Sequence, residues 1–179
     1  MLAKTFGSAV YGVNAYLVTI EVNLVQGTKF FLVGLPDNAV KESQQRVESV
    51  IKDLGFQFPR NRVIVNLAPA DIRKEGSAYD LPIALGILSA AGHIVADNLD
   101  KYIIMGELSL DGNLRPIKGV LPIAIEARKQ GFKGFILPKE NEDEAAIVNN
   151  IDIIGVKHIN EAIDFLCGKL VIQPLVKDT

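Results

Sequence analysis

One helix-length segment constrains the fold more than any other part of the chain. From Leu81 to about Ala91 the residues are apolar nearly all round the predicted helix. Pro82 falls in its first turn, where a missing N–H costs little. A helix without a polar face has to be covered on every side. We therefore expect this helix to lie in the core, with Asp80 before it as the N-cap residue, a role worth roughly 1 kcal/mol. A functional acid at Asp80 is the alternative, but the sequence offers it no partner base.

Three segments have the composition of β-strands. Residues 15–22, 28–33 and 62–68 are rich in β-branched and aromatic side chains. The first two flank the turn-like pair Gln26-Gly27, so we expect them to pair with each other as neighbouring strands.

A second helix is predicted between the strands 28–33 and 62–68. It begins after Pro36, with Asp37 or Asn38 as its cap, and Gly55 supplies its C-terminal stop. Its apolar residues recur at spacings of three, four and seven: Val40, Val47, Val50, Ile51 and Leu54. One such stripe normally faces a sheet, so we interpret it as core.

The second half of the chain alternates strands and helices. A run from Tyr102 to Leu110 is interrupted by Asp111-Gly112-Asn113 and resumes at Leu114, which predicts a hairpin. After it we expect helices at about 120–130, 142–148 and 160–166 and strands at 135–137 and 151–156. The pattern indicates a mixed α/β domain, in one body or in two lobes that meet near residue 100.

Composition excludes several classes of protein. Of the 179 residues 49% are apolar and the formal net charge is −2, so any DNA contact has to come from a local patch. Cys167 is the only cysteine, which excludes an internal disulfide and a Cys-x-x-Cys metal site. The first residues lack the apolar core of a signal peptide, and no apolar stretch is long enough to span a membrane. We expect a cytoplasmic protein with no membrane partner.

Nucleotide and metal motifs are also missing. The sequence contains neither G-x-x-x-x-G-K-[ST] nor G-x-G-x-x-G, and Gly168-Lys169 is followed by leucine. We therefore expect no ATP hydrolysis by this chain and no cofactor in it. His93 and His158 are isolated in sequence, so capping or surface roles are favoured over metal ligation. No metal site is predicted.

Several sequence motifs, in a fixed order along the chain, resemble those of known families. Segments 106–119 (GELSLDGNLRPIKG) and 136–141 (ILPKEN) resemble the Lon peptidase domain, with its Gly-Glu hairpin, Pro-Ile and later ILPKEN. With 34–43 (GLPDNAVKES) and 75–86 (EGSAYDLPIALG) they are more similar to the N-terminal domain of Mg-chelatase-like AAA+ ATPases of the YifB/ComM type. The resemblance extends to about Leu166. It implies an α/β fold (an α+β mixed sheet) of the ribosomal protein S5 domain 2-like, Lon peptidase-like superfold.

The resemblance also implies that the peptidase machinery is absent. An ungapped overlay places Ala78 where Lon peptidases have their nucleophilic serine and Leu121 where they have their catalytic lysine. Alanine and leucine supply neither a nucleophile nor a base. Ser77 and Lys118 lie close by in sequence, so a Lon-like serine peptidase with a displaced Ser-Lys dyad is the runner-up. We favour a loop role for Ser77 and a solvated charge for Lys118, and expect no peptidase activity.

The function implied by the family belongs to a larger protein. The chain resembles a non-catalytic accessory domain of an ATP-dependent DNA-remodelling protein of the helicase or branch-migration type, active in recombination or competence. ATP and Mg²⁺ are then expected in a motor domain whose Walker motifs follow Thr179. The expected partners are further copies of the full-length protein, in a hexameric ring, and DNA. A plain oligomerisation module is the third alternative.

Four cations are the candidate DNA contacts, because Arg and Lys grip phosphate without reading base identity. They are Arg73 and Lys74 in one loop and Arg115 and Lys118 after the hairpin. We expect residues 1–170 to form the Lon-like domain and residues 171–179 to begin a linker to the motor.

Overall fold

The architecture comes from a computed structural model that describes residues 2–74 and 76–177. One sheet of seven strands, in the order β3-β4-β2-β1-β5-β8-β9, runs through the molecule. In chain order its strands are β1 (Leu2–Tyr11), β2 (Asn14–Val25), β3 (Phe30–Val33), β4 (Arg62–Ala68), β5 (Tyr102–Ile104), β8 (Gly134–Pro138) and β9 (Asp152–Val156). Strands β6 (Glu107–Leu108) and β7 (Leu114–Arg115) form a separate hairpin. The two halves of the chain therefore share one continuous sheet.

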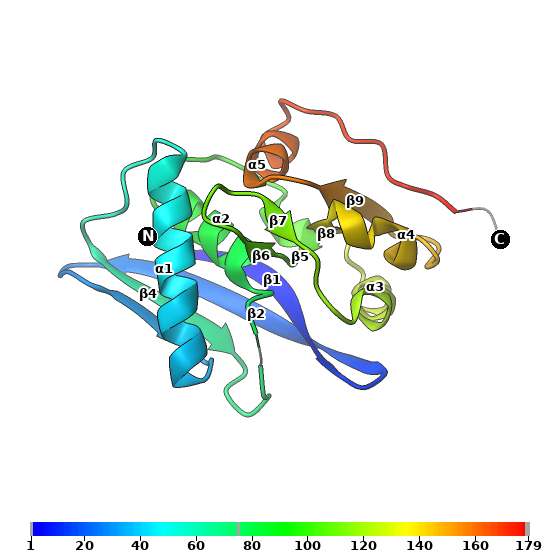
Figure 1. Cartoon of the computed structure of the whole chain (residues 1–179), viewed down its shortest axis with the longest axis horizontal. Helices are drawn as coiled ribbons and strands as arrows, with labels where there is room; N and C mark the ends of the chain where they lie inside the picture. Colours follow the sequence, from blue (N-terminus) through cyan, green and yellow to red (C-terminus); the bar gives the residue numbers. More distant parts are fainter. Residues whose placement is uncertain (1, 75, 178–179) are drawn as a thin grey trace.

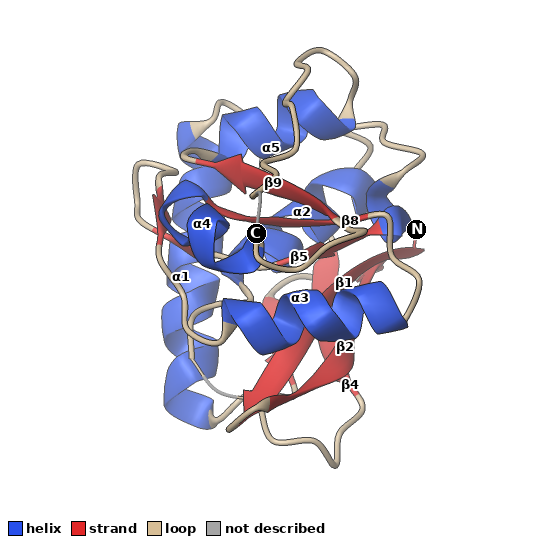
Figure 2. Ribbon diagram, turned by 90° about the vertical axis from the view of Figure 1, so that its right-hand side faces the viewer, coloured by secondary structure: helices blue, strands red, loops and turns tan. Residues whose placement is uncertain are grey.

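The helices pack on both faces of this sheet (Figures 1 and 2). They are α1 (Asp37–Asp53), α2 (Asp80–Ala90), α3 (Val120–Lys129), α4 (Glu142–Ala145) and α5 (Ile159–Leu166), with short 3-10 turns at Leu99–Lys101 and Lys139–Asn141. Helix α2 packs on β1 and β2 and also against α1. Helix α3 packs on β2 from the other side, and α4 and α5 pack on β9.

The apolar helix lies at the centre, as its sequence predicts. Every residue of α2 except Ser89 is buried, because α1 covers the side that the sheet leaves open. At Gly86 an added Cβ would lie 2.8 Å from the Cγ2 atom of Val22, so glycine allows the helix to approach β2 this closely. The stripe of α1 is also confirmed as core, since Val47, Val50 and Ile51 are buried.

The expected pairing of the strands 15–22 and 28–33 is wrong. Strand β4 lies between β2 and β3, pairing antiparallel with β2 over seven residues and parallel with β3 over four. The longer ladder with β4 takes the edge of β2, and the positive φ of Lys29 (81°) helps to turn β3 away. Strand β1, which the pattern did not predict, pairs with the other edge of β2 from Leu2 to Tyr11.

Two predicted helix caps are also wrong. Helix α1 begins at Asp37 after Pro36, without a side-chain cap hydrogen bond. Helix α2 begins at Asp80 itself, with Tyr79 in the N-cap position and again no side-chain cap. The hairpin at Asp111 and the helix and strand positions that follow are confirmed, although α4 ends at Ala145, earlier than expected.

The last described residues turn back onto the sheet. Residues 171–177 contain no helix or strand, and the Leu175 N–H donates to the Ile153 carbonyl of β9 at 3.1 Å. The remaining residues of the predicted linker, 178–179, lie outside the described part. Within the described residues, no helix combines the length and apolar character needed to cross a membrane.

Candidate functional site

A large cavity lies where three segments distant in sequence meet. It has a volume of about 670 Å³ and is lined by the end of β1, the loop before α2, and the connection from β7 to α3. This volume falls within the range of ligand pockets, roughly 300–1,000 Å³. The cavity is therefore the candidate site on grounds of size, before any residue in it is considered.

The cavity brings together several residues that the sequence singled out. Arg73, Ser77 and Ala78 line it from the loop before α2, and Lys118 lines it from the β7–α3 connection. Leu121 is half-buried in the first turn of α3, packs against the core, and is not among the lining residues. Of the two residues that the overlay predicts at the positions of the Lon dyad, only Ala78 therefore lines the cavity.

Lys74 does not belong to an accessible cationic surface. Its side chain is buried, with the residue 2% exposed, and Nζ donates to the carbonyls of Pro69 at 2.6 Å and Ile72 at 2.7 Å. Burial lowers the pKa of Lys74, and nearby Asp71 acts in the opposite direction. This lysine ties its own loop together, so the interpretation of Lys74 as a phosphate contact does not agree with its position.

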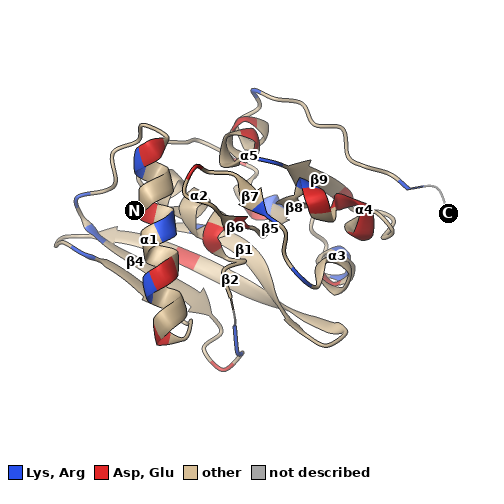
Figure 3. Cartoon of the chain, viewed as in Figure 1, with Lys and Arg blue, Asp and Glu red and all other residues tan. Residues whose placement is uncertain are grey.

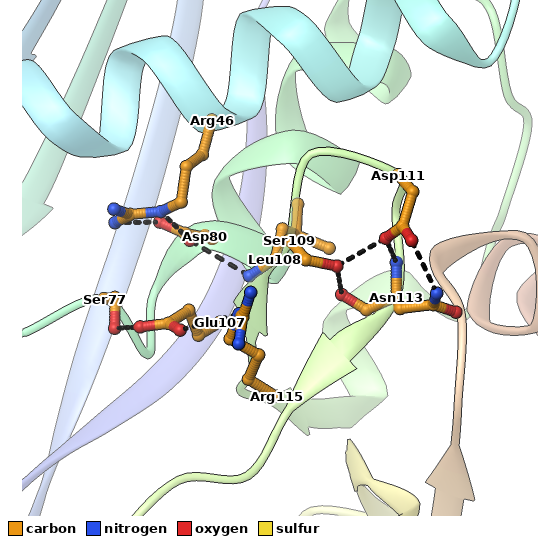
Figure 4. Close-up of polar contacts among 9 residues, drawn as sticks. All are labelled: Arg46, Ser77, Asp80, Glu107, Leu108, Ser109, Asp111, Asn113 and Arg115. Carbon is orange, nitrogen blue, oxygen red and sulfur yellow. Dashed lines mark hydrogen bonds and ion pairs between the residues drawn. The ribbon is translucent and has the colours of Figure 1, made fainter.

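Ser77 is held by a carboxylate rather than by a lysine (Figure 4). Its hydroxyl donates to Oε1 of Glu107, whose other oxygen, Oε2, lies 3.5 Å from Nε of Arg115. Arg115 comes from β7, is largely exposed, and is not among the residues that line the cavity. The bond to Glu107 therefore ties the loop before α2 to the β6–β7 hairpin.

Asp80, which is fully buried, is the centre of a polar network (Figure 4). Its carboxylate accepts hydrogen bonds from the Ser43 hydroxyl at 2.8 Å, from Nε of Arg46 at 2.6 Å and from the Leu108 N–H at 3.0 Å. Burial raises the pKa of the Asp80 carboxyl, while Arg46, Leu108 and Ser43 act to lower it. The network joins α1, α2 and the hairpin, so Asp80 has a structural role that sequence reasoning missed.

The remaining chemistry of the site is limited. The N–H groups of Asp80 and Leu81 at the start of α2 already donate to the carbonyls of Ser77 and Gly106. Over residues 2–74 and 76–177, no group of three or more His, Cys, Asp or Glu side chains could hold a metal ion. His158 caps α5 by accepting from the Asn160 N–H at 3.0 Å, in line with the capping role favoured from sequence.

Two tyrosines at the cavity were not predicted as site residues. The Tyr11 hydroxyl donates to the Arg73 carbonyl, and its ring packs edge-on against Tyr16 with centroids 5.5 Å apart. The Tyr79 hydroxyl donates to the Ser8 carbonyl at 3.1 Å, and burial raises the pKa of Tyr79. Because Tyr11 and Arg73 are far apart in sequence, no local motif could have indicated this arrangement.

Comparison with known proteins defines the class to which this fold belongs. The chain is 31% identical to Lon protease 2 of Bacillus subtilis over 179 aligned residues, which cover 88% of the chain and 32% of that protease. With the mixed sheet and its helices, this similarity confirms the Lon-like α/β fold.

The family is narrower than the fold class. Residues 20–141 match the family described as subunit ChlI of Mg-chelatase. The chain is 43% identical to YifB of Escherichia coli over 162 residues (90% of the chain, 32% of YifB). It is also 43% identical to the competence protein ComM of Haemophilus influenzae over 169 residues (94% of the chain, 33% of ComM). The chain belongs to this Mg-chelatase-like family of AAA+ proteins, and spans about a third of the length of these relatives.

Proposed function

We propose that this chain is a non-catalytic accessory domain of an ATP-dependent DNA-remodelling protein of the helicase or branch-migration type. The observation that carries the proposal is membership of a family that includes a competence protein. It is supported by a cavity lined by Ala78, the residue that the overlay with the Lon pattern predicts at the nucleophile position. ATP and Mg²⁺ would act in the parent protein, outside this chain. The domain would help to assemble the ring, a hexamer, and would contact DNA.

Deletion tests this role directly. In the full-length parent, removal of residues 1–170 should leave ATP binding by the motor intact but reduce ring formation and strand exchange on branched DNA. Sedimentation would report the assembly, and gel assays with a synthetic four-way junction would report the remodelling. Full assembly and full remodelling by the truncated protein would contradict the proposal.

A displaced-dyad peptidase remains the second candidate, because Ser77 and Lys118 line the same cavity. A serine attacks a peptide bond only when a base removes its proton. Here the Ser77 hydroxyl donates to Glu107, so Lys118 would have to replace that contact. We expect no casein cleavage by the chain. Cleavage that disappears in Ser77→Ala would establish the peptidase and overturn the non-catalytic assignment.

A plain oligomerisation module is distinguished from a DNA-contacting domain by charge removal. If Arg73→Ala and Lys118→Ala, introduced together in the parent, reduce DNA binding while the ring still forms, the domain contacts DNA. Unchanged DNA binding with loss of the ring would favour the oligomerisation module.

A further inference from the structure

The cavity is cationic although the chain as a whole is weakly acidic. Arg73 and Lys118 line it, and no Asp or Glu is among the described residues that do so. On α1, by contrast, Lys and Arg lie among Asp and Glu (Figure 3). Lys118 is exposed and makes no ion pair or hydrogen bond with any described residue. Its charge is therefore available to an anion.

The position of Lys118 is fixed by its neighbour. Gly119 has a left-handed φ of +78°, and an added Cβ there would lie 2.9 Å from Cγ2 of Val10 on β1. Only glycine combines this backbone conformation with so close an approach. The segment that carries Lys118 is thus held tightly against the end of β1.

An aromatic surface adjoins the two cations. Tyr11 and Tyr16, on the two strands of the β1–β2 hairpin, remain 38% and 42% exposed while their rings pack edge to face. The hydrogen bond from Tyr11 to the Arg73 carbonyl places this pair of rings beside the cationic loop. Exposed rings next to Arg and Lys are the combination that binds single-stranded nucleic acid, through base stacking and phosphate neutralisation.

We propose that the cavity and the β1–β2 hairpin form a binding site for single-stranded nucleic acid, with phosphates at Arg73 and Lys118 and a base stacked on Tyr11. The site deepens the DNA-remodelling function proposed above and rests on it for its biological context. An extended peptide is the other ligand that a cavity beside a strand could hold. Main-chain bonds to β1 would require neither the two cations nor the exposed rings, so these features favour nucleic acid.

Fluorescence anisotropy of a labelled oligothymidylate, titrated at low salt with the chain itself, tests the site. Arg73→Ala with Lys118→Ala should weaken binding by about tenfold, since phosphate contacts dominate affinity. Tyr11→Ala should weaken it by about fivefold or more, the lower end of what the loss of one stacked base costs. Circular dichroism would check the folding of each variant.

Matched controls separate charge and ring from folding. Lys118→Arg keeps the charge, and Tyr11→Phe keeps the ring but loses the hydrogen bond to the Arg73 carbonyl, so each should bind more tightly than the corresponding alanine variant. Lys169→Ala removes an exposed lysine beyond α5, outside the cavity, and should also leave the affinity unchanged. Lys118→Glu, an exposed charge reversal, provides a second variant if Tyr11→Ala does not fold.

Three results would overturn the proposal of a site for single-stranded nucleic acid. The first is no binding of oligothymidylate at low salt, or binding that none of the cavity variants alters. The second is binding of heparin with the same affinity and no effect of Tyr11→Ala, which would indicate a polyanion patch without stacking. The third is capture of a labelled unstructured peptide in place of oligothymidylate. Each outcome is separate from the ring-assembly and junction assays on the parent, which test the accessory function itself.

Discussion

Two polar clusters flank the start of α2, and they use charge in opposite ways. Asp80 is fully buried, and its carboxylate accepts hydrogen bonds from α1 and from the β6–β7 hairpin. On the cavity side, the exposed side chains of Arg73 and Lys118 line an open volume. A few residues thus separate a charge that holds the fold from charges that face solvent.

The comparison shows why residue type alone does not identify a site. A buried charge is tolerated only when it is paired and hydrogen-bonded, so the Asp80 network leaves no capacity for a ligand. An exposed cation keeps its donors available. Lys74 differs from Lys118 in this respect, because its ammonium group donates to two backbone carbonyls.

The largest expected effect comes from removing the buried acid. Asp80→Ala leaves Arg46 without its partner in a partly buried position, and we expect a loss of about 3–5 kcal/mol in unfolding free energy. Urea denaturation of the chain followed by circular dichroism measures it. Glu48→Ala, which breaks the exposed pair with Lys52, is the control and should cost no more than about 0.5 kcal/mol. Equal losses of unfolding free energy for the two variants would show that the Asp80 network stabilises the fold no more than an exposed ion pair does.

Lys74→Met should destabilise the chain without changing nucleic-acid binding. The carbonyls of Pro69 and Ile72 would lose their donor, at a cost of about 1–3 kcal/mol in unfolding free energy. Burial lowers the pKa of Lys74 in the folded state, so the unfolded chain binds more protons at alkaline pH. The stability of the unaltered chain relative to this variant should therefore rise as the pH increases toward the ordinary lysine value. A DNA-binding defect with unchanged stability would instead indicate that Lys74 contacts DNA.

Tyr79→Phe tests the hydrogen bond from Tyr79 to the Ser8 carbonyl, which lies between the Asp80 network and the cavity cations. The Ser8 carbonyl would lose its buried donor while the ring still fills its place, for a loss of about 0.5–1.5 kcal/mol in unfolding free energy. Thermal unfolding at constant pH would measure the change. No change at all would mean that the hydroxyl does not contribute to holding β1 against α2.

The smallest effect on stability is expected at the cavity cations. Arg73→Ala and Lys118→Ala should each change the unfolding free energy by no more than about 0.5 kcal/mol, as is usual for exposed side chains. Their effect should be seen in the salt dependence of oligothymidylate binding, where each lost phosphate contact lowers the logarithmic slope by about 0.7. An unchanged slope, measured from low to moderate salt, would show that neither residue contacts a phosphate.

Local patterns predicted most elements of the fold but not their partners. The apolar helix, the stripe of α1 and the hairpin at Asp111 follow from period and turn chemistry, which are properties of neighbouring residues. The insertion of β4 between β2 and β3 could not be predicted in this way, because a strand pattern records which faces are buried and not which strand lies alongside. For the same reason the sequence did not indicate that β1 would pair with both β2 and β5.

In the candidate site, too, some features could be predicted from the sequence and others could not. Sequence comparison with the Lon pattern predicted Ala78 at the position of the nucleophile, and the motifs alone indicated the family and contained no phosphate-binding loop. Only the tertiary structure decided that Asp80 is a buried network rather than a cap, that Lys74 is inaccessible, and that Tyr11 lies beside Arg73. The physical reason is that period, capping and turn preferences act between residues close in the chain. Burial and hydrogen-bond partners depend on segments that meet only when the sheet has formed.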